Sequence, residues 1–260
     1  MFSVSHLNNL RLFEIDRIVK LMRPGARVLE IGAGTGRQAA EIAARGFEIE
    51  AIEISSSNYS SERQFKITDY DGHTIPFSDR SFDIVFSSNV LEHVPDLPRL
   101  HSEIRRVLRP DGYCLHVLPT HSWRFWTILS AFPDAPVYVF ASSQSLVPRL
   151  PPSRGELRRL SASWLNVMKR CAGLLFQPRH GERGNLVSEI WLFRPGWWRK
   201  NFVQNHFEVV FDEPMSLFYT GNMLFGARWS FEGRQVASRF LGSACHIFKI
   251  RPSDVTTSNK

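Results

Sequence analysis

The sequence predicts an α/β fold with a doubly wound, mostly parallel sheet. An apolar strand at residues 28–31 runs into a turn with three glycines, and a helix-forming segment at 38–45 follows at once. A second apolar strand at 49–54 comes next, and strand and helix patterns keep alternating as far as residue 118. This alternation is typical of βαβ units, whose strands are parallel.

The other elements of the first 119 residues follow from their apolar patterns. Apolar residues recur at helical spacing from Leu7 to Met22, and Pro24-Gly25 ends that helix. The segment 58–62 is short and rich in serine, so the element between the second and third strands is predicted to be reduced. The remaining elements are a short strand at 65–68, a buried strand at 82–87, a helix at 97–108 that Pro110-Asp111-Gly112 ends, and a fifth strand at 113–118.

Regular structure is expected again near Glu189. A turn at 194–197 leads into a predicted helix at 197–205, and strands are predicted at 207–211 and 245–250. The excursion between these two strands, 215–240, is rich in aromatic residues and could complete a binding pocket.

Length and composition are those of a globular protein, with 260 residues of which 43% are apolar and 22% charged. Cys114, Cys171 and Cys245 lie far apart and show no disulfide or zinc spacing, which favours a reducing compartment. There is no signal-peptide pattern and no run of eighteen apolar residues. The sequence therefore predicts a cytoplasmic protein, soluble or peripheral on the inner membrane face.

The glycine turn and the strand after it predict a small-molecule site. Glycine allows positive φ and close approach of a ligand to the backbone, and the turn carries Gly32, Gly34 and Gly36. Glu53 lies near the tip of the next strand, where a carboxylate can accept hydrogen bonds from ribose hydroxyls. Glu30 enters the turn and suits an ammonium group better than a diphosphate. Together these residues indicate an adenosine-containing ligand.

Four segments that follow one another in the sequence extend this pattern. They are LEIGAGTGR, AIEIS, DGHTIPFSDRSFDIVFSSNVLEHV and EIRRVLRPDGYCLHV. Together they resemble the class I S-adenosylmethionine-dependent methyltransferases, particularly the subgroup with the ubiquinone and menaquinone pathway enzymes. The resemblance covers about residues 26–119. It implies a Rossmann-like, seven-stranded sheet, methyltransferase activity and S-adenosyl-L-methionine as cofactor.

The resemblance also implies cofactor-binding residues. Glu53, with the neighbouring Ile54, falls at the ribose position, although aspartate is commoner there in the family. Asp71, with Gly72, falls where the family holds the adenine amino group. The residues placed around the methionine part are Glu30, Gly32, Ala33, Gly34, Gly36 and Asn89.

Beyond residue 119 the family pattern ends and the composition changes. Residues 120–200 hold six of the seven tryptophans and twelve Lys and Arg against four Asp and Glu, a local charge of +8. The predicted organisation is a cofactor-binding core at 1–119, a largely helical insertion at 120–194, the end of the sheet at 195–252 and a flexible tail at 253–260. In the family this connection shapes the acceptor pocket, so we expect a substrate-recognition lid.

Two parts of the insertion are amphipathic. The segment 122–132 is short and aromatic, and a predicted helix at 155–176 separates apolar residues from basic ones. Such a helix either lies in an anionic membrane interface or packs as a lid with a solvated basic face. A linker or flexible loop is predicted before it, at 148–153.

A hydroxyl acceptor must lose a proton during methyl transfer, and histidine is the natural base near neutral pH. His93 after the fourth strand, His121 after the fifth and His180 in the loop PRHGERG lie on the expected acceptor side. For each, a structural or solvated role is the alternative. Some quinone-pathway enzymes have Glu-x-x-Glu-His ending at the His93 position and bind a divalent metal. Here Asn89 replaces the first glutamate, and no metal ligand is assigned.

Three functions remain open from the sequence. The first is O-methylation of an amphipathic or lipid-linked acceptor, such as a glycolipid, a lipid-carried sugar or a prenylated ring. The second is methylation of a soluble small molecule. The third is binding or modification of nucleic acid, which the net charge of +7 and the pI near 9.7 suggest but no recognised module supports. The sequence carries no signal for an oligomeric state.

Overall fold

The computed structural model describes residues 4–57, 63–130, 165–166, 168–169, 178–222 and 226–253. The strands are β1 (Arg27–Ile31), β2 (Glu48–Ile54), β3 (Thr68–Tyr70), β4 (Phe82–Ser88), β5 (Leu108–Pro119), β6 (Phe207–Pro214) and β7 (Cys245–Pro252). They form one sheet in the order β3-β2-β1-β4-β5-β7-β6. β7 is antiparallel to both neighbours, and all other pairs are parallel. The predicted doubly wound, mostly parallel, seven-stranded sheet is confirmed.

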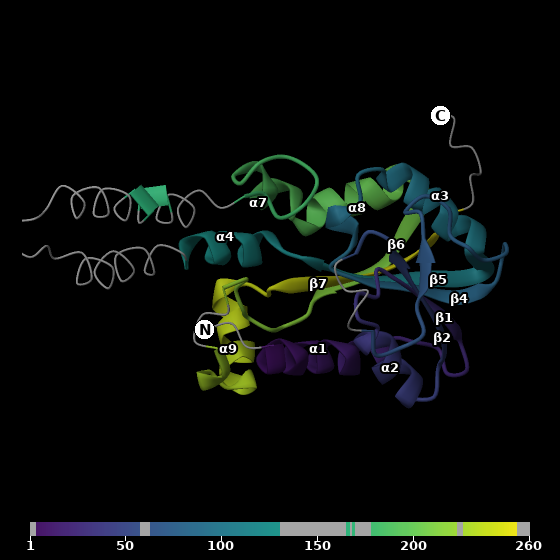
Figure 1. Ribbon diagram of the computed structural model, residues 1–260, viewed down its shortest axis with the longest axis horizontal. Helices are drawn as coiled ribbons and strands as arrows, with labels where there is room; N and C mark the ends of the chain where they lie inside the picture. Colours follow the sequence, from purple (N-terminus) through teal and green to yellow (C-terminus); the bar gives the residue numbers. More distant parts are fainter. Residues whose placement is uncertain are drawn as a thin grey trace, which may run out of the picture.

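Helices cover both faces of the sheet. The described helices are α1 (Val4–Val19), α2 (Arg37–Ala44), α3 (Leu97–Val107), α4 (His121–Leu129), α7 (Ser188–Leu192), α8 (Pro195–Gln204) and α9 (Phe231–Leu241), with two short 3₁₀ turns, η1 (Leu91–His93) and η2 (Gly226–Arg228). Figure 1 shows α1 and α2 on one face and α3 and α8 on the other. The arrangement is the three-layer sandwich expected of alternating strands and helices.

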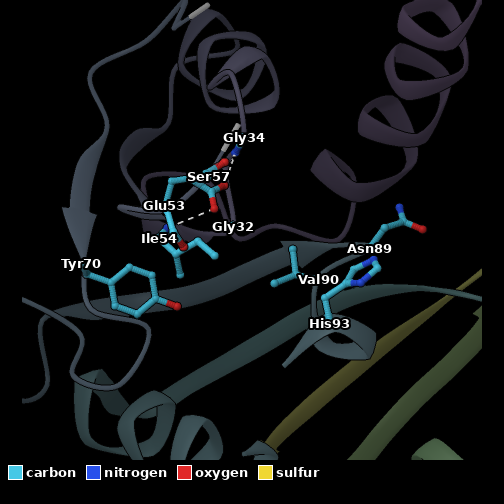
Figure 2. Close-up of a pocket in the computed structure, with 10 residues that line it drawn as sticks. Gly32, Gly34, Glu53, Ile54, Ser57, Tyr70, Asn89, Val90 and His93 are labelled. Carbon is cyan, nitrogen blue, oxygen red and sulfur yellow. Dashed lines mark hydrogen bonds between the residues drawn. The ribbon is translucent and has the colours of Figure 1, made fainter. Parts of the chain in front are cut away.

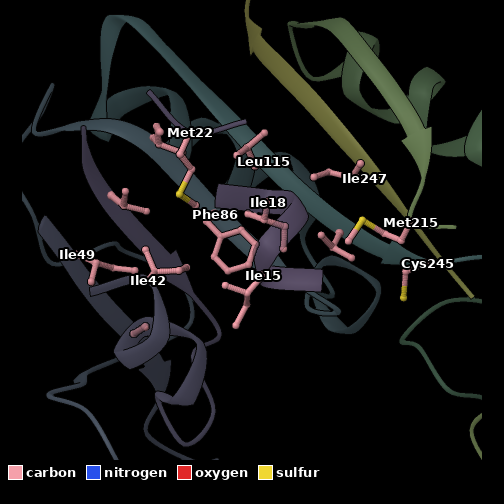
Figure 3. Packing of buried hydrophobic residues seen from close by; sticks show 14 of the residues in the cluster. Ile15, Ile18, Met22, Ile42, Ile49, Phe86, Leu115, Met215, Cys245 and Ile247 are labelled. Carbon is pink, nitrogen blue, oxygen red and sulfur yellow. The ribbon is translucent and has the colours of Figure 1, made fainter. Parts of the chain in front are cut away.

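The central strands send side chains into two cores, one on each face of the sheet. Val28 belongs to the same buried cluster as Ile18 of α1, whereas Leu29, the next residue of β1, belongs to the cluster of Ile104 of α3 on the opposite face. Figure 3 shows Ile15 and Ile18 lying over Phe86 of β4. This alternation follows from the period-two geometry of a strand, and both faces are buried because helices cover both.

Most predicted boundaries shift by one or a few residues, and α8 begins at Pro195, inside the turn predicted at 194–197. Two of the shifts have a clear structural reason. β3 spans Thr68–Tyr70 instead of 65–68, because Phe65 and Ile67 pack against Gly36 of the glycine turn. The fifth strand begins directly after α3, so Pro110-Asp111-Gly112 lies within β5 and not in a separate turn. The register between β4 and β5 shifts at this point, and such a bulge is where a strand tolerates proline.

The excursion between β6 and β7 contains a helix that its aromatic composition concealed. Ser230 caps α9 by accepting a hydrogen bond from the Gly233 N–H, and Gly242, with φ +87°, follows its last residue. Serine before a helix and glycine after it are the usual end signals.

Much of the insertion lies outside the described residues, including the predicted loop at 148–153. The segment 58–62 and most of the tail also lie outside them. Thr120 caps α4, which begins the insertion, through a hydrogen bond from the Trp123 N–H. Of the predicted helix at 155–176, Leu165, Asn166, Met168 and Lys169 are described and are helical. Among the described parts of the chain, no helix is both long enough and apolar enough to cross a bilayer.

We expect Ile18→Ala to destabilise the protein by about 2–5 kcal/mol, because the side chain is fully buried between α1 and the sheet and leaves a cavity. Val236→Ala, at a 53% exposed position of α9, is the matched control and should change stability by less than about 0.5 kcal/mol. Urea unfolding followed by circular dichroism measures both. Equal effects would contradict the packing of α1 on the sheet.

Candidate functional site

The sheet opens a crevice between β1 and β4. The strand order reverses there, so the chain leaves the two strands towards opposite faces. Ligands of open α/β sheets bind outside the carboxyl ends of the strands at such a point. The segments that follow β1 and β4 therefore form the walls of the candidate site.

The glycine turn after β1 needs glycine for two reasons. Gly32, Gly34 and Gly36 have φ values of +71°, +58° and +77°, which side chains disfavour. A Cβ atom on Gly32 would also lie 2.5 Å from Val90 Cγ2 on the opposite wall. The turn stays close to β2, since the Gly32 and Ala33 N–H groups both donate to the Ile52 carbonyl.

Glu53 joins the glycine turn to the tip of β2. Its Oε2 accepts a hydrogen bond from the Gly34 N–H at 2.6 Å, and its Oε1 accepts one from the Ile54 N–H at 3.0 Å (Figure 2). The residue is 8% exposed. A carboxylate has about four acceptor positions, so these two bonds fix its orientation and leave capacity for a ligand.

A cavity of about 530 Å³ lies over these groups, and a second of about 440 Å³ adjoins it. They share Ile54, Ser56, Tyr70 and His93 as walls. The first cavity is also lined by Gly32, Gly34, Glu53, Ser57, Asn89 and Val90 (Figure 2), and the second by Ser55, Asp71, Gly72, His73 and Pro95. Both volumes are in the range of small-molecule sites.

Glu30 lies beneath the turn and lines neither cavity. It is 1% exposed, and burial raises the pKa of its carboxyl to about 8, with the Glu53 carboxylate adding to the shift. Its Oε2 has no hydrogen-bond partner among the described residues. A buried carboxyl of this kind gains from a nearby cation. Ala33 is also buried, and Gly36 packs on Phe65 away from the cavity.

Asp71 closes the far end of the second cavity. Its Oδ1 accepts hydrogen bonds from the Thr74 and His73 N–H groups, both at 2.7 Å, and these bonds hold the pKa of the carboxyl below its usual range. Gly72, with φ +77°, makes the turn. This loop therefore presents a fixed carboxylate at the cavity rim.

Asn89 forms the wall opposite the glycine turn. It follows β4 with φ +55° and donates its backbone N–H to the Val117 carbonyl. With its amide oxygen directed toward Arg11, that oxygen accepts from the guanidinium at 2.6 and 3.1 Å. Arg11 is in turn paired with the buried Glu14 at 2.6 Å. Helix α1 thereby holds the tip of β4.

The three predicted histidines separate into two groups. His93 lines both cavities, and its ring lies 4.8 Å from that of His180, measured between centroids. Burial lowers the pKa of His93 and, to about 4, that of His180. His121 begins α4 and lines neither cavity; its pKa is lowered by burial and by nearby Arg194. The structure brings together His93 and His180 but not His121.

His180 reaches this position because its loop is fastened at both ends. The His180 and Gly181 N–H groups donate to Glu189 Oε1, both at 2.6 Å. Glu189 is fully buried and pairs with Arg124 of α4 at 2.8 Å. Arg183, three residues after His180, donates to the Leu91 carbonyl of η1 at 3.0 Å and to the Val94 carbonyl at 2.6 Å.

Several cavity residues were not singled out from the sequence. Tyr70 and His73 flank Asp71, and the serines at 55–57 follow β2, so their places next to predicted site residues were the available signal. Val90 was missed because an aliphatic residue after a strand usually indicates core. Glu92 was seen only as part of a sequence motif, although its buried carboxyl proves to lie beside His93.

The fold and the site are similar to those of one class of enzyme. A doubly wound sheet with a glycine turn after β1, and a carboxylate at the tip of β2, is the arrangement of class I S-adenosylmethionine-dependent methyltransferases. Residues 29–116, about a third of the chain, match the family described as methyltransferase domain. This segment is a methyltransferase domain, and S-adenosylmethionine is its cofactor.

Curated relatives are similar to this chain in sequence over part of their length. An uncharacterised methyltransferase of Mycobacterium sp. (strain JLS) is 40% identical over 105 residues, which are 38% of this chain and 41% of that protein. The sterol 24-C-methyltransferase ERG6B of Gibberella zeae is 33% identical over 102 residues, 35% of this chain and 27% of that protein. This chain therefore spans less than half the length of these relatives.

Solved structures support the fold over nearly the whole chain. An S-adenosylmethionine-dependent methyltransferase from Mesorhizobium loti has a TM-score of 0.51 at 14% identity, covering 92% of this chain and 97% of that one. A further methyltransferase structure, from Listeria monocytogenes, has a TM-score of 0.53 at 11% identity, covering 95% and 100%. At these identities the likeness shows a shared fold.

The buried Glu30 carboxyl predicts a pH-dependent stability. Its pKa of about 8 lies above the ordinary 4.5, so the folded protein retains a proton that the unfolded chain loses. The stability it contributes is complete below about pH 4.5 and is lost as the pH rises to about 8. Glu30→Gln removes this loss. The free energy of unfolding of the variant minus that of the parent should therefore be larger at pH 8 than at pH 5, by up to about 3 kcal/mol.

Urea unfolding at both pH values, without cofactor, measures this difference. Glu232→Gln, at an exposed position in the first turn of α9, is the control and should have the same effect at both. A Glu30→Gln effect that does not change with pH would mean that the folded protein holds Glu30 ionised.

Proposed function

We propose that this protein transfers the methyl group of S-adenosylmethionine to a hydroxyl of an amphipathic or lipid-linked acceptor. The observation that carries the proposal is the cavity between β1 and β4, where the glycine turn, Glu53 and His93 meet. In this proposal Glu53 binds the ribose, Asp71 binds the adenine, and Asn89 faces the methionine part.

The contacts of the two carboxylates support these roles. Each oxygen of Glu53 accepts one backbone N–H, so each retains a lone pair for a ribose hydroxyl. Both backbone bonds of Asp71 fall on Oδ1, which leaves Oδ2 to accept from an amino group. Glu30 lies below the turn, where the ammonium group of a methionine moiety would favour its ionised form.

The chemistry asks for alignment and for removal of a proton. The bound cofactor supplies an activated methyl group, so the protein must hold the acceptor oxygen behind it and exclude water. His93 lies in the cavity wall and His180 directly behind it, which makes this pair the candidate for taking up the hydroxyl proton. His121, the first residue of α4, lines neither cavity, so we give it no part in this step.

An amphipathic acceptor is favoured by the segment after β5. Residues 120–200 carry a charge of +8, and the described part exposes Phe125, Leu165, Met168 and Trp191 by 46–64%. Exposed aromatic and aliphatic side chains beside basic ones suit a lipid surface. Two relatives are named for apolar acceptors, the sterol methyltransferase of Gibberella zeae and squalene methyltransferase 1 of Botryococcus braunii.

A soluble acceptor is the second candidate, with the insertion acting as a lid only. Glycolipids, lipid-carried sugars and prenylated rings all belong to the amphipathic class. Peripheral association with an anionic inner membrane face is part of the first candidate and not of the second. Vesicle binding therefore distinguishes them.

Glu53→Ala should weaken S-adenosylmethionine binding at least about tenfold, because it removes the ribose acceptor and leaves two N–H groups unpaired. Glu50→Gln, on the same strand but outside the cavity lining, is the matched control and should bind as the parent does. Calorimetric titration with S-adenosylmethionine and S-adenosylhomocysteine measures this, with NAD as a ligand that should not bind. Unchanged affinity in Glu53→Ala would refute the cofactor site.

The double variant Leu165→Glu with Met168→Glu should reduce co-sedimentation with anionic phosphatidylglycerol vesicles several-fold at low salt. Both side chains are exposed and apolar, and the substitution adds like charge at the interface. Val203→Glu, at a 63% exposed position of α8, is the control. No vesicle binding by the parent would favour the soluble acceptor, and retention on RNA with a steep salt dependence would favour nucleic acid.

A further inference from the structure

Three potential metal ligands meet beside the cavity, and one of them, His93, belongs to its lining. Glu92 and His93 lie on η1, directly after β4, and His180 lies in the loop that precedes α7. Their ligating atoms all lie within 4.8 Å of one another, and Glu92 Oε1 is 3.8 Å from His93 Nε2. The set unites residues 87 positions apart (93 to 180) in the sequence.

The carboxylate of this cluster is buried without a donor. The Glu92 side chain is 0% exposed, and neither of its oxygens has a hydrogen-bond partner in the described parts of the chain. Burying a carboxylate without compensation costs several kcal/mol, so such groups are paired, protonated or bound to a cation. Two arginines lie near, but Arg11 is paired with Glu14, and Arg183 donates to two carbonyls.

The loop that brings His180 is held against Glu92 by its backbone. The Glu182 N–H donates to the Glu92 carbonyl at 2.9 Å, and a Cβ atom on Gly181 would lie 2.7 Å from the same oxygen. Only glycine allows this approach. Trp123 of α4 packs its ring on the other side of His180, with centroids 4.7 Å apart. The three ligands are therefore positioned before any ion binds.

We propose that Glu92, His93 and His180 bind one divalent transition-metal ion of the Zn²⁺ type. Two imidazoles and one carboxylate are a ligand set for Zn²⁺, Co²⁺ or Fe²⁺, whereas Mg²⁺ and Ca²⁺ prefer oxygen ligands. Ligands around tetrahedral zinc lie about 3.4 Å apart, so ligand atoms that are now as much as 4.8 Å apart would approach one another by up to about 1.4 Å when an ion binds. This set differs from Glu-x-x-Glu-His, because the position of the first glutamate holds Asn89 and the third ligand comes from outside the matched segment.

The position of the ion follows from His93, which lines both cavities. A site with three protein ligands keeps a coordination position open. A role for the ion in methyl transfer rests on the proposed function: with the ion bound, His93 and His180 act as its ligands and not as the base, and the ion would acidify the acceptor hydroxyl in place of a histidine. Binding of the ion itself does not depend on that function.

Cobalt is the probe for the test, because its visible absorption reports coordination number and ligand type. Protein without a polyhistidine tag is treated with a chelator, dialysed and titrated with CoCl₂. We expect one equivalent to give the intense bands of four- or five-coordinate cobalt, which ZnCl₂ then abolishes. His180→Ala and Glu92→Gln should weaken binding at least about tenfold.

His121→Ala is the matched control, since His121 lies on the same helix as Trp123 but outside the cluster, and it should bind cobalt as the parent does. Titration of each variant with S-adenosylhomocysteine shows whether it has folded and tests the cofactor site separately. Cobalt binding by His180→Ala equal to the parent's, or no stoichiometric binding by the parent, would overturn the proposal. Loss of cobalt binding with cofactor binding retained would support it.

Discussion

The reversal of strand order between β1 and β4 is the constraint on which the rest of the site depends. Parallel strands end at one edge of the sheet, and only at the reversal do the following segments part and leave space between them. The glycine turn, Glu53, Asp71 and Asn89 come from four different strands. They meet because Glu53 lies at the carboxyl end of its strand and the others directly follow the ends of theirs.

A buried polar network keeps one wall of this crevice in place. Glu14 of α1 accepts hydrogen bonds from Arg11 at 2.6 Å and from the Tyr219 hydroxyl at 2.8 Å, and that hydroxyl also lies 3.0 Å from Cys245 Sγ. Arg11 continues the network to Asn89. Helix α1, the segment after β6 and strand β7 therefore fix Asn89, which has positive φ. An αL conformation at a non-glycine residue persists only where its surroundings impose it.

Most of the fold and one half of the candidate site could be predicted from the sequence because their signals are local. The glycine turn and Glu53 lie within one βαβ unit, so spacing alone placed them together. The meeting of Glu92 with His180 has no local signal, since it depends on a loop from beyond β5. α9 was hidden because its aromatic residues suggested a pocket, and β3 shifted because Phe65 packs on Gly36.

The buried Arg124–Glu189 pair indicates what the segment after β5 is built to do. Removing both charges from water costs more than such a pair usually returns, so stability alone is a poor reason for it. Glu189 also accepts the His180 and Gly181 N–H groups, and thus ties α4 and α7 to the loop beside His93. The pair therefore fixes where the insertion meets the wall of the cavity at His93. Positioning of His180 is the role that best explains why this buried pair is present.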